Sequence, residues 1–430
     1  MPPRRLAGRA VLAAAAALAV TAGPPASPAH AAPSAPVAVR APSWSPADRV
    51  LRTDQVRDEQ WQLAELRAKT AWRTSTGRGV VVAVIDSGVD GSHPDLAGQV
   101  LPGLDLVAPA GTDDPDPVGH GTTVAGLIAG RADDDRGVVG LAPDAKILPI
   151  RVLDAENRYD DALVIAKAVR WAVDRGARVI NLSLGGSGDS PALAAALDYA
   201  FARDVVVVAC TGNLATSTTT KVWYPAREPG VLAVTGLDRD SENLWSGSIT
   251  GHETVLSAPA TALYGARSRG GYWRVQGTSF AAPLVAATAA LVRAGYPKMT
   301  AGDVVNRLIS TARDLGATGR DDRFGYGMVD PVAALTADVP AVGQNPLDDN
   351  ASPGVVGFGP APGEGPDTRA AAAGQGGDPF AGPGKTGWSA RAAGQAEVSA
   401  PERLWTGLAV FVALLTGAAL MVRRFRRARR

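Results

Sequence analysis

The chain has 430 residues, with 43 Lys and Arg against 42 Asp and Glu, and its formal net charge is +1. This length allows one large domain or two ordinary ones, and no basic patch suggests a nucleic-acid partner. A single cysteine, Cys210, excludes an intramolecular disulfide. A lone thiol at the end of a valine-rich run is expected to be a small buried hydrophobe.

The N-terminus predicts a secretory signal peptide over residues 1–31. Arg4 and Arg5 precede an apolar run over 6–22, and Ala29-His30-Ala31 supplies the small residues of a cleavage site after Ala31. The alternative is an uncleaved N-terminal anchor.

The C-terminus predicts a membrane-spanning helix over Leu404–Val422. This uncharged run of 19 residues would be about 28 Å long as a helix, which matches the hydrocarbon thickness of a bilayer. Six arginines follow it in residues 423–430. The positive-inside rule puts this basic tail in the cytoplasm and the chain before residue 403 outside, as a type I protein. A buried core helix is disfavoured, because it would draw six arginines into a packed domain.

Between these ends, apolar runs that predict strands alternate with runs that predict helices. An Ala/Pro/Ser-rich stretch over 32–46 is followed by a helical pattern over 54–72, with Trp61, Leu63, Leu66 and Trp72 as candidate docking residues. The predicted strands lie at 79–85, 146–153, 178–184, 205–209 and 231–235. The predicted helices lie at 122–129, 161–174, 191–202 and 280–294.

The predicted strands are continuous apolar runs, so both of their faces should be buried. A parallel sheet covered by helices on both faces is the α/β architecture that permits this. We place this domain at residues 75–336 and an N-terminal extension at 32–74. Residues 337–400 are rich in Gly, Pro and Ala. This stretch cannot bury enough apolar surface to offset its ordering entropy, so it predicts a disordered stalk before the membrane.

A serine on a tight turn is the first candidate for chemistry. Gly277-Thr278-Ser279 leads directly into the predicted helix over 280–294. A serine hydroxyl is a poor nucleophile at neutral pH, so the placement matters only with a base and an orienting acid. Two upstream motifs offer them: Val84-Ile85-Asp86-Ser87-Gly88 at a strand end, and Gly119-His120-Gly121-Thr122 at a helix start. Open α/β sheets place their sites at such strand ends.

The order Asp86, His120, Ser279 is one of three unrelated orders in which a Ser-His-Asp triad occurs. At these residues the chain resembles the subtilisin-like serine proteases (subtilases), over about residues 78–336. The resemblance implies a subtilisin-like fold in which Ser279 is the nucleophile, His120 the general base and Asp86 the residue that orients His120. Carbohydrate or ester hydrolases of the α/β type are a distant alternative, because they place the serine early and the histidine last.

The resemblance also implies the residues around the triad. Asn213 would donate its side-chain amide to the oxyanion together with the Ser279 backbone N–H; taken alone, it reads as a turn asparagine. Ser183, Leu184, Gly185 and Gly186 resemble the segment that pairs with an extended substrate as an added strand. Gly185, Gly186 and Gly188 would leave room for a substrate side chain. Asn181 is expected to be a satisfied structural asparagine.

The other histidines and the loop carboxylates are given no catalytic role. His93 is expected to be structural and His252 to lie in a loop. The loop carboxylates are expected to be solvated; they are Asp90, Asp95, Asp113, Asp114 and Asp116. Many subtilases bind calcium, so the resemblance allows a structural calcium ion in an acidic loop. The spacing defines no ligand set, and we predict no catalytic metal and no cofactor.

The layout of the whole chain resembles the mycosins, the membrane-anchored subtilases of type VII secretion in actinobacteria. The resemblance rests on the two membrane-directed ends, the stalk, Trp61-Gln62-Leu63 in the extension, and Ser75-Thr76-Gly77 before the domain. It implies that the extension over 32–74 wraps the protease without blocking it. Mycosins commonly have disulfides in the protease domain, and a chain with one cysteine departs from that pattern.

We therefore expect a membrane-anchored serine endopeptidase outside the cytoplasmic membrane. Its expected partners are protein or peptide substrates, the bilayer through Leu404–Val422, and a type VII secretion membrane complex. The alternative is a structural component of a secretion complex whose protease activity is secondary.

Overall fold

The computed structural model describes residues 53–108, 114–159, 161–217 and 219–348. The predicted signal peptide over 1–31, the membrane helix over 404–422 and the basic tail over 423–430 lie outside the described residues. Residues 337–348 of the predicted stalk are described, and Pro340, Val342, Asn345 and Leu347 are hydrogen-bonded to Asn306, Asp303 and Gly230. The predicted start of disorder at residue 337 is therefore wrong. The rest of the stalk lies outside the described residues, and the bounds of the other segments stay predictions.

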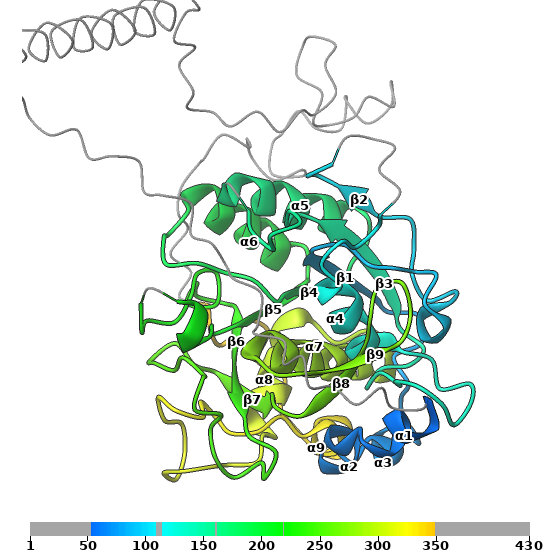
Figure 1. Ribbon diagram of the computed structural model, residues 1–430. Coiled ribbons are helices and arrows are strands. Elements are labelled where there is room, and N and C mark those ends of the chain that lie inside the picture. The colour runs from blue at the N-terminus through cyan, green and yellow to red at the C-terminus, as the bar shows by residue number, and fades with distance from the viewer. Residues whose placement is uncertain (1–52, 109–113, 160, 218, 349–430) are drawn as a thin grey trace, which may run out of the picture. The chain divides into compact units, whose positions relative to one another are not determined.

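A parallel sheet of seven strands forms the centre of the described domain (Figure 1). Its spatial order is β2-β3-β1-β4-β5-β6-β7, and every neighbouring pair is parallel. The strands are β1 (Val81–Asp86), β2 (Leu104–Asp105), β3 (Lys146–Arg151), β4 (Val179–Leu182), β5 (Val206–Cys210), β6 (Leu232–Leu237) and β7 (Leu256–Pro259). The predicted α/β fold class is confirmed.

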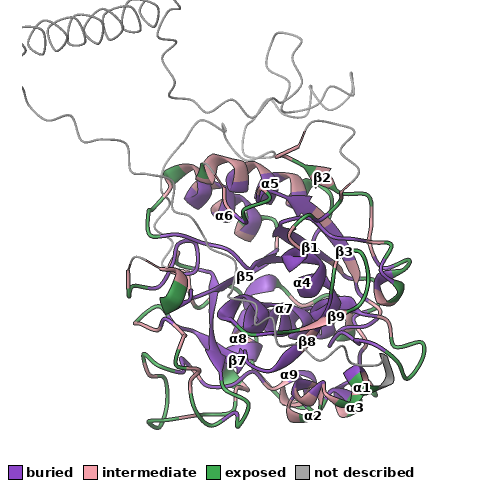
Figure 2. Ribbon diagram, in the orientation of Figure 1, coloured by how far each residue is buried: buried purple, intermediate pink, exposed green. Residues whose placement is uncertain are grey.

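Helices cover both faces of this sheet, as the apolar strands require. Figure 1 shows α5 (Ala162–Asp174) and α6 (Pro191–Ala202) on one side of β1, β4 and β5. On the other side lie α4 (His120–Ala129) and α7 (Thr278–Gly295), with α8 (Ala301–Ser310) beside α7. Figure 2 shows the central strands, α4 and α7 buried, while the edge strand β2 and the outer faces of α5 and α6 are partly exposed.

The long apolar helix α7 is the core helix of the domain. Among the described residues it alone is long and apolar enough to cross a membrane, and most of it is buried inside the protein. It packs against β4, β5, β6 and β7 and against α4. Pro283 lies within it, beyond its first turn, and removes the backbone donor that would bond the carbonyl of Ser279. The length and composition of α7 therefore reflect burial within the sheet packing.

Several elements were not predicted from the sequence. They are the short edge strand β2, strand β7, the hairpin of β8 (Leu263–Ala266) and β9 (Tyr272–Val275), and the helices α8 and α9 (Pro331–Thr336). Two short 3₁₀ turns lie at Pro94–Leu96 and Leu214–Thr216. Four glycines between α8 and α9 adopt positive φ; they are Gly316, Gly319, Gly325 and Gly327.

The single helix predicted over 54–72 is wrong in detail. The structure has three short helices, α1 (Thr53–Asp58), α2 (Trp61–Glu65) and α3 (Ala68–Ala71). Gln60 and Arg67 interrupt the helical pattern, and Arg67 has a left-handed conformation with φ of 52°. The chain turns at these two residues, so that short segments follow the surface of the domain.

The three short helices are fixed to the domain by side chains, as the docking prediction expected. Leu66 is buried, and Trp61, Leu63 and Trp72 pack against the core while partly exposed. The indole of Trp61 donates to Thr261 O at 3.1 Å, and that of Trp72 donates to Leu141 O at 2.8 Å. Further hydrogen bonds join Arg57 and Gln60 to the segment 134–139.

Candidate active site

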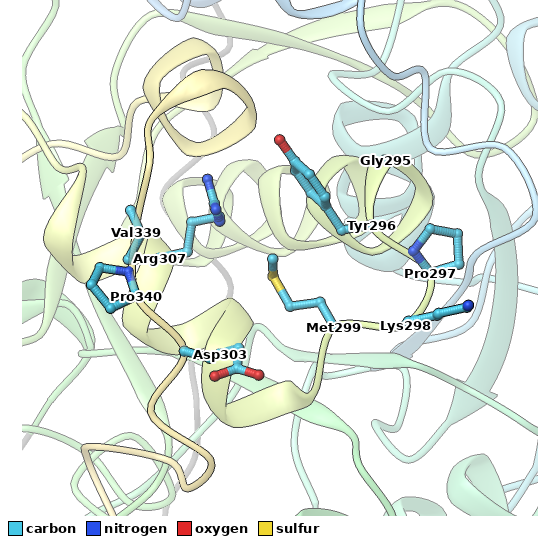
Figure 3. A pocket seen from close by; sticks show the side chains of 10 residues that line it. Gly295, Tyr296, Pro297, Lys298, Met299, Asp303, Arg307, Val339 and Pro340 are labelled. Carbon is cyan, nitrogen blue, oxygen red and sulfur yellow. The ribbon is translucent and has the colours of Figure 1, made fainter.

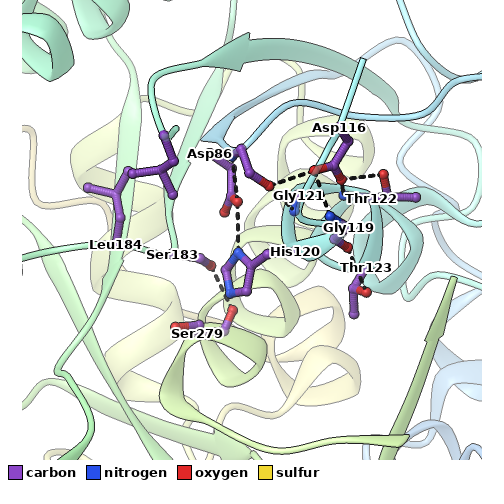
Figure 4. Close-up of polar contacts among 12 residues, drawn as sticks. Asp86, Asp116, Gly119, His120, Gly121, Thr122, Thr123, Ser183, Leu184 and Ser279 are labelled. Carbon is purple, nitrogen blue, oxygen red and sulfur yellow. Dashed lines mark hydrogen bonds and ion pairs between the residues drawn. The ribbon is translucent and has the colours of Figure 1, made fainter. Parts of the chain in front are cut away.

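Three element ends bring the predicted triad residues together. Asp86 is the last residue of β1, His120 the first of α4, and Ser279 the second of α7. Strand β1 lies in the middle of the sheet, and both helices pack on the same face of it. Figure 4 shows the His120 ring between Asp86 and Ser279.

Asp86 and His120 form a buried hydrogen-bonded pair. The His120 Nδ1 lies 2.7 Å from Asp86 Oδ1, which also accepts from the Ser87 backbone N–H at 2.7 Å. The other carboxylate oxygen, Oδ2, is buried and has no hydrogen-bond partner in the described part of the chain. Because the carboxylate binds Nδ1–H, the Nε2 nitrogen of the ring is left to accept a proton.

A second buried carboxylate, Asp116, lies beside this pair, and it was missed from the sequence. The side chain is 1% exposed, which corrects the expectation that it is solvated. It accepts from the Ser87 hydroxyl, the Gly119 N–H, and both the N–H and hydroxyl of Thr122, at 2.5–2.8 Å. Asp116 therefore ties the turn after Asp86 to the helix start at His120 (Figure 4).

These two carboxylates act on the proton affinity of His120. Burial alone would lower the pKa of the imidazole, but the charge and hydrogen bond of Asp86, and the charge of Asp116, raise it above its ordinary value. Burial raises the pKa of Asp116 itself, against its four hydrogen bonds. His120 is thus a stronger base than a solvated histidine.

The Ser279 side chain points to a sulfur atom in this structure. Its hydroxyl donates to Cys210 Sγ at 3.8 Å and makes no hydrogen bond to His120. Cys210 is fully buried, as expected, and burial raises the pKa of its thiol to about 11. Its position against the serine was not predicted, because the last residue of β5 and the turn before α7 are far apart in the chain.

The backbone behind Ser279 is held by the end of β4. The Ser183 hydroxyl donates to Ser279 O at 2.7 Å, and the Asn181 Nδ2 donates to the Ser183 hydroxyl at 2.9 Å. Asn181 is structural, but it is not fully satisfied, since its buried Oδ1 has no partner within the described ranges. The Ser183 side chain therefore supports the serine turn and does not face the open site.

Asn213 has the orientation that an oxyanion donor requires. Its Oδ1 accepts from the Thr278 N–H at 3.0 Å and from the Thr278 hydroxyl at 2.9 Å. These two donors fix which amide atom is the oxygen, so the Nδ2 group points elsewhere, and no described residue accepts from it. The Ser279 N–H lies in the first turn of α7, where backbone donors have no partner within the helix.

The segment predicted to pair with substrate is only partly available. Gly186 already pairs with Tyr224, through hydrogen bonds of 2.9 Å and 2.8 Å in both directions. Leu184 is buried, and its carbonyl lies 3.9 Å from Cys210 Sγ. Within the described ranges, the backbone N–H and C=O of Gly185 have no hydrogen bond, so this residue could pair with an extended peptide.

The other histidines and loop carboxylates named from the sequence form no second catalytic or metal site among the described residues. His93 is buried and bonds Gly271 O and the Asp95 N–H, and His252 lies in an exposed turn, in agreement with the predicted loop position. Asp90 is not solvated as expected, because it is buried and bonds Ser92 and the Arg269 N–H. Asp113 lies outside the described residues. Among the described residues, no group of three or more acidic, histidine or cysteine side chains could hold a metal ion.

A cavity of about 530 Å³ lies away from the triad (Figure 3). It is found where α7 ends and α8 begins, against the segment 339–341. Tyr296, Met299 and Arg307 line it. The Arg307 guanidinium donates hydrogen bonds to the carbonyls of Ala334 and Ala337, so it already has partners within the protein.

Comparison with known proteins decides the family. The subtilase family, Peptidase_S8, matches residues 77–327, more than half of the chain. The chain belongs to the subtilase family. Residues 77–327 are thus a subtilisin-like serine protease domain, as the three motifs predicted.

Individual relatives agree with this subtilase assignment. Fervidolysin from Fervidobacterium pennivorans is 35% identical over an alignment of 320 residues, which covers 67% of this chain but only 45% of that protein. Subtilisin DY from Bacillus licheniformis is 38% identical over 252 residues, 58% of this chain and 88% of that protein. The solved structure of the MycP3 protease from the type VII (ESX-3) secretion system is similar with a TM-score of 0.59 and 33% identity. It covers 69% of this chain and 92% of that one. The resemblance to mycosins is therefore confirmed.

Proposed function

We propose that the protein is a membrane-anchored serine endopeptidase that hydrolyses peptide bonds outside the cytoplasmic membrane. The observation that carries the proposal is the buried Asp86–His120 hydrogen bond of 2.7 Å with Ser279 on the other side of the ring. Subtilase membership supports the same reaction. So does Asn213, whose Oδ1 accepts from Thr278 and whose Nδ2 group is therefore free to donate to an oxyanion. We propose no cofactor for it.

The proposed reaction begins with a rotation of the Ser279 side chain from Cys210 to His120, between two staggered rotamers. The hydroxyl oxygen attacks the peptide carbonyl and His120 Nε2 takes its proton, while Asp86 stabilises the imidazolium. The Asn213 amide and the Ser279 N–H would hold the oxyanion. His120 then gives the proton to the leaving amine, and a water molecule, activated in the same way, releases the acyl group from Ser279.

The experiment is labelling of the purified full-length protein with a fluorophosphonate probe, together with hydrolysis of a protein substrate. We expect wild type to label and Ser279→Ala neither to label nor to cleave, with an unchanged melting temperature. Ser310→Ala, an exposed serine on α8, is the matched control and should behave as wild type. Cleavage by pure Ser279→Ala protein would contradict the assignment.

We further propose that the protease works with a type VII secretion complex, which the likeness to MycP3 supports. The bilayer anchor would be Leu404–Val422, with the protease outside and the C-terminus in the cytoplasm. The second candidate is a structural role in that complex, with proteolysis secondary. Complementation of a deletion strain separates the two: if Ser279→Ala restores secretion the structural role dominates, and if only wild type does, proteolysis does.

A further inference from the structure

Three backbone segments enclose the space beside Ser279 where a substrate side chain would enter. The segments 183–186 and 211–213 follow the carboxyl ends of the neighbouring strands β4 and β5. The segment 222–224 is hydrogen-bonded to both of these segments. The Trp223 N–H donates to Thr211 O at 2.9 Å, and Tyr224 pairs with Gly186. The segments 183–186 and 211–213 thus form two walls of this space and the segment 222–224 forms its floor, and hydrogen bonds connect all three.

The indole of Trp223 fills the space between the two walls. A Cβ atom built on Gly212 would lie 2.5–2.7 Å from three ring atoms of Trp223, and one on Gly185 would lie 3.0 Å from its Cβ. Gly212 therefore makes room for this ring, and Gly185 makes room for the Tyr224 carbonyl and the base of the Trp223 side chain. Trp223 is 3% exposed, and its Nε1 donates to the Ser217 hydroxyl at 3.0 Å, which fixes the ring plane. Trp223 therefore occupies part of the space that Gly185 was expected to leave for a substrate side chain.

The reaction geometry decides which substrate residue meets this ring. The attacked carbonyl carbon must lie at Ser279 Oγ, with its oxygen near the Asn213 amide and the Ser279 N–H. Gly185 is the residue whose backbone could pair with the incoming chain. The side chain of the residue that carries the attacked carbonyl then enters between Gly185 and Gly212, above Trp223.

We propose that Trp223 closes this pocket, so that the enzyme cleaves after glycine, alanine or serine and rejects larger residues. The inference rests on the proposed function and names its substrate class. A larger side chain would have to displace a buried aromatic ring held by a hydrogen bond. Close-packed interiors accept such insertions poorly.

The test uses the full-length protein in detergent with three probes. One is the fluorophosphonate, and the others are peptidyl diphenyl phosphonates that differ only in carrying Ala or Phe next to phosphorus. For wild type we expect the Ala probe to inactivate at least about 100-fold faster than the Phe probe, the size of selectivity that pocket shape commonly provides. Trp223→Ala should speed the Phe probe about 100-fold and change the Ala rate far less.

Controls keep the result decisive. Trp171→Ala removes a partly buried tryptophan of α5 and should leave the Ala-to-Phe ratio unchanged. Trp223→Leu replaces Trp223→Ala if the latter melts below the assay temperature. If the fluorophosphonate labels wild type but the Phe probe reacts as fast as the Ala probe, this inference is wrong and the proposed function stands. If none of the probes labels folded wild type, the proposed function fails, and the inference fails with it.

Discussion

His120 is held between two buried carboxylates that differ in their roles. Asp86 contacts the ring directly, whereas Asp116 acts through Ser87 and the first turn of α4. Asp116 is therefore a positioning residue. It also adds a negative charge near the imidazole, which raises the pKa of His120.

Asp116→Asn tests this role. The variant keeps the shape of the side chain but removes the charge and one acceptor, so the pKa of His120 should fall. Since neutral His120 is the base, the acid limb of kcat/KM should move to lower pH. Looser positioning should reduce kcat about 10- to 100-fold at neutral pH, with a smaller change in KM. The pH profile of peptide hydrolysis measures both.

Asp133→Asn is the matched control, because Asp133 forms an exposed pair with Arg131. Its pH profile should follow wild type. An Asp116→Asn protein with an unshifted acid limb would show that Asp116 only supports folding.

The residues around the site differ in how far the sequence could predict them. The meeting of Asp86, His120 and Ser279 was predictable because each lies in a local motif at a strand or helix end. The contact of Asp116 with the start of α4 could have been predicted, since Asp116 lies four residues before His120 and has Thr122 as a nearby partner. Trp223 was not, because the glycines it covers, Gly185 and Gly212, lie on two other segments and nothing local marks their contact.

At the scale of elements, α1, α2 and α3 hold the N-terminal side of the domain. The hydrogen bonds of Arg57, Gln60, Trp61 and Trp72 end on the segment 134–141 and on Thr261, and none of them is made to Asp86, His120 or Ser279. These contacts suit an extension that stabilises the domain while the site stays open.

Trp72→Ala should therefore lower stability without changing the site. Trp72 is partly exposed and donates one hydrogen bond, so we expect a loss of about 2 kcal/mol, below the 3–5 kcal/mol of a fully buried tryptophan. The midpoint of thermal unfolding should fall by about 4–8 °C. Fluorophosphonate labelling per folded molecule should not change.

Lys69→Ala, at an exposed position of α3, is the control and should melt as wild type does. Faster labelling of Trp72→Ala at a temperature where it is folded would indicate instead that the extension restricts the site.

The elements also show where sequence patterns were sufficient. Strands β1, β3, β4, β5 and β6 were predicted because each is a continuous apolar run that ends at a polar residue or a turn. The break of the helical pattern at Arg67 was not, since no Gly or Pro marks a left-handed residue there. In the hairpin, β9 is largely half-exposed and β8 packs against α4, so tertiary contact rather than a local pattern sets its position.

On the scale of the molecule, the two ends of the described domain support each other. Helix α3 packs against α9, Arg67 bonds the Asp330 carboxylate, and Glu65 pairs with Arg313 at 2.7 Å. The extension and the C-terminal helix α9 therefore meet on one part of the domain. The chain after α9 is in turn hydrogen-bonded to Gly230 through Leu347 and Asn345, so a pull on the stalk would reach these bonds before α9.

Anchoring by Leu404–Val422 is the prediction at this scale. Truncation after Ala400 should release an active protease from the membrane fraction into the medium, as cell fractionation with probe labelling would measure. Truncation after Val422 removes only the basic tail and should leave the protein in the membrane fraction. Recovery of the Ala400 truncation with the membrane would contradict the predicted anchor.

The sulfur beside Ser279 has a further consequence for measurement. Cys210 is the only cysteine of the chain and is fully buried, and the pKa of its thiol is raised to about 11. An alkylating reagent needs an exposed thiolate, so it can modify Cys210 only in molecules in which the catalytic centre has opened. The rate of alkylation under native conditions would therefore report the free energy of that opening. The unmodified chain therefore contains its own probe of how often the structure around Ser279 opens, without an introduced label.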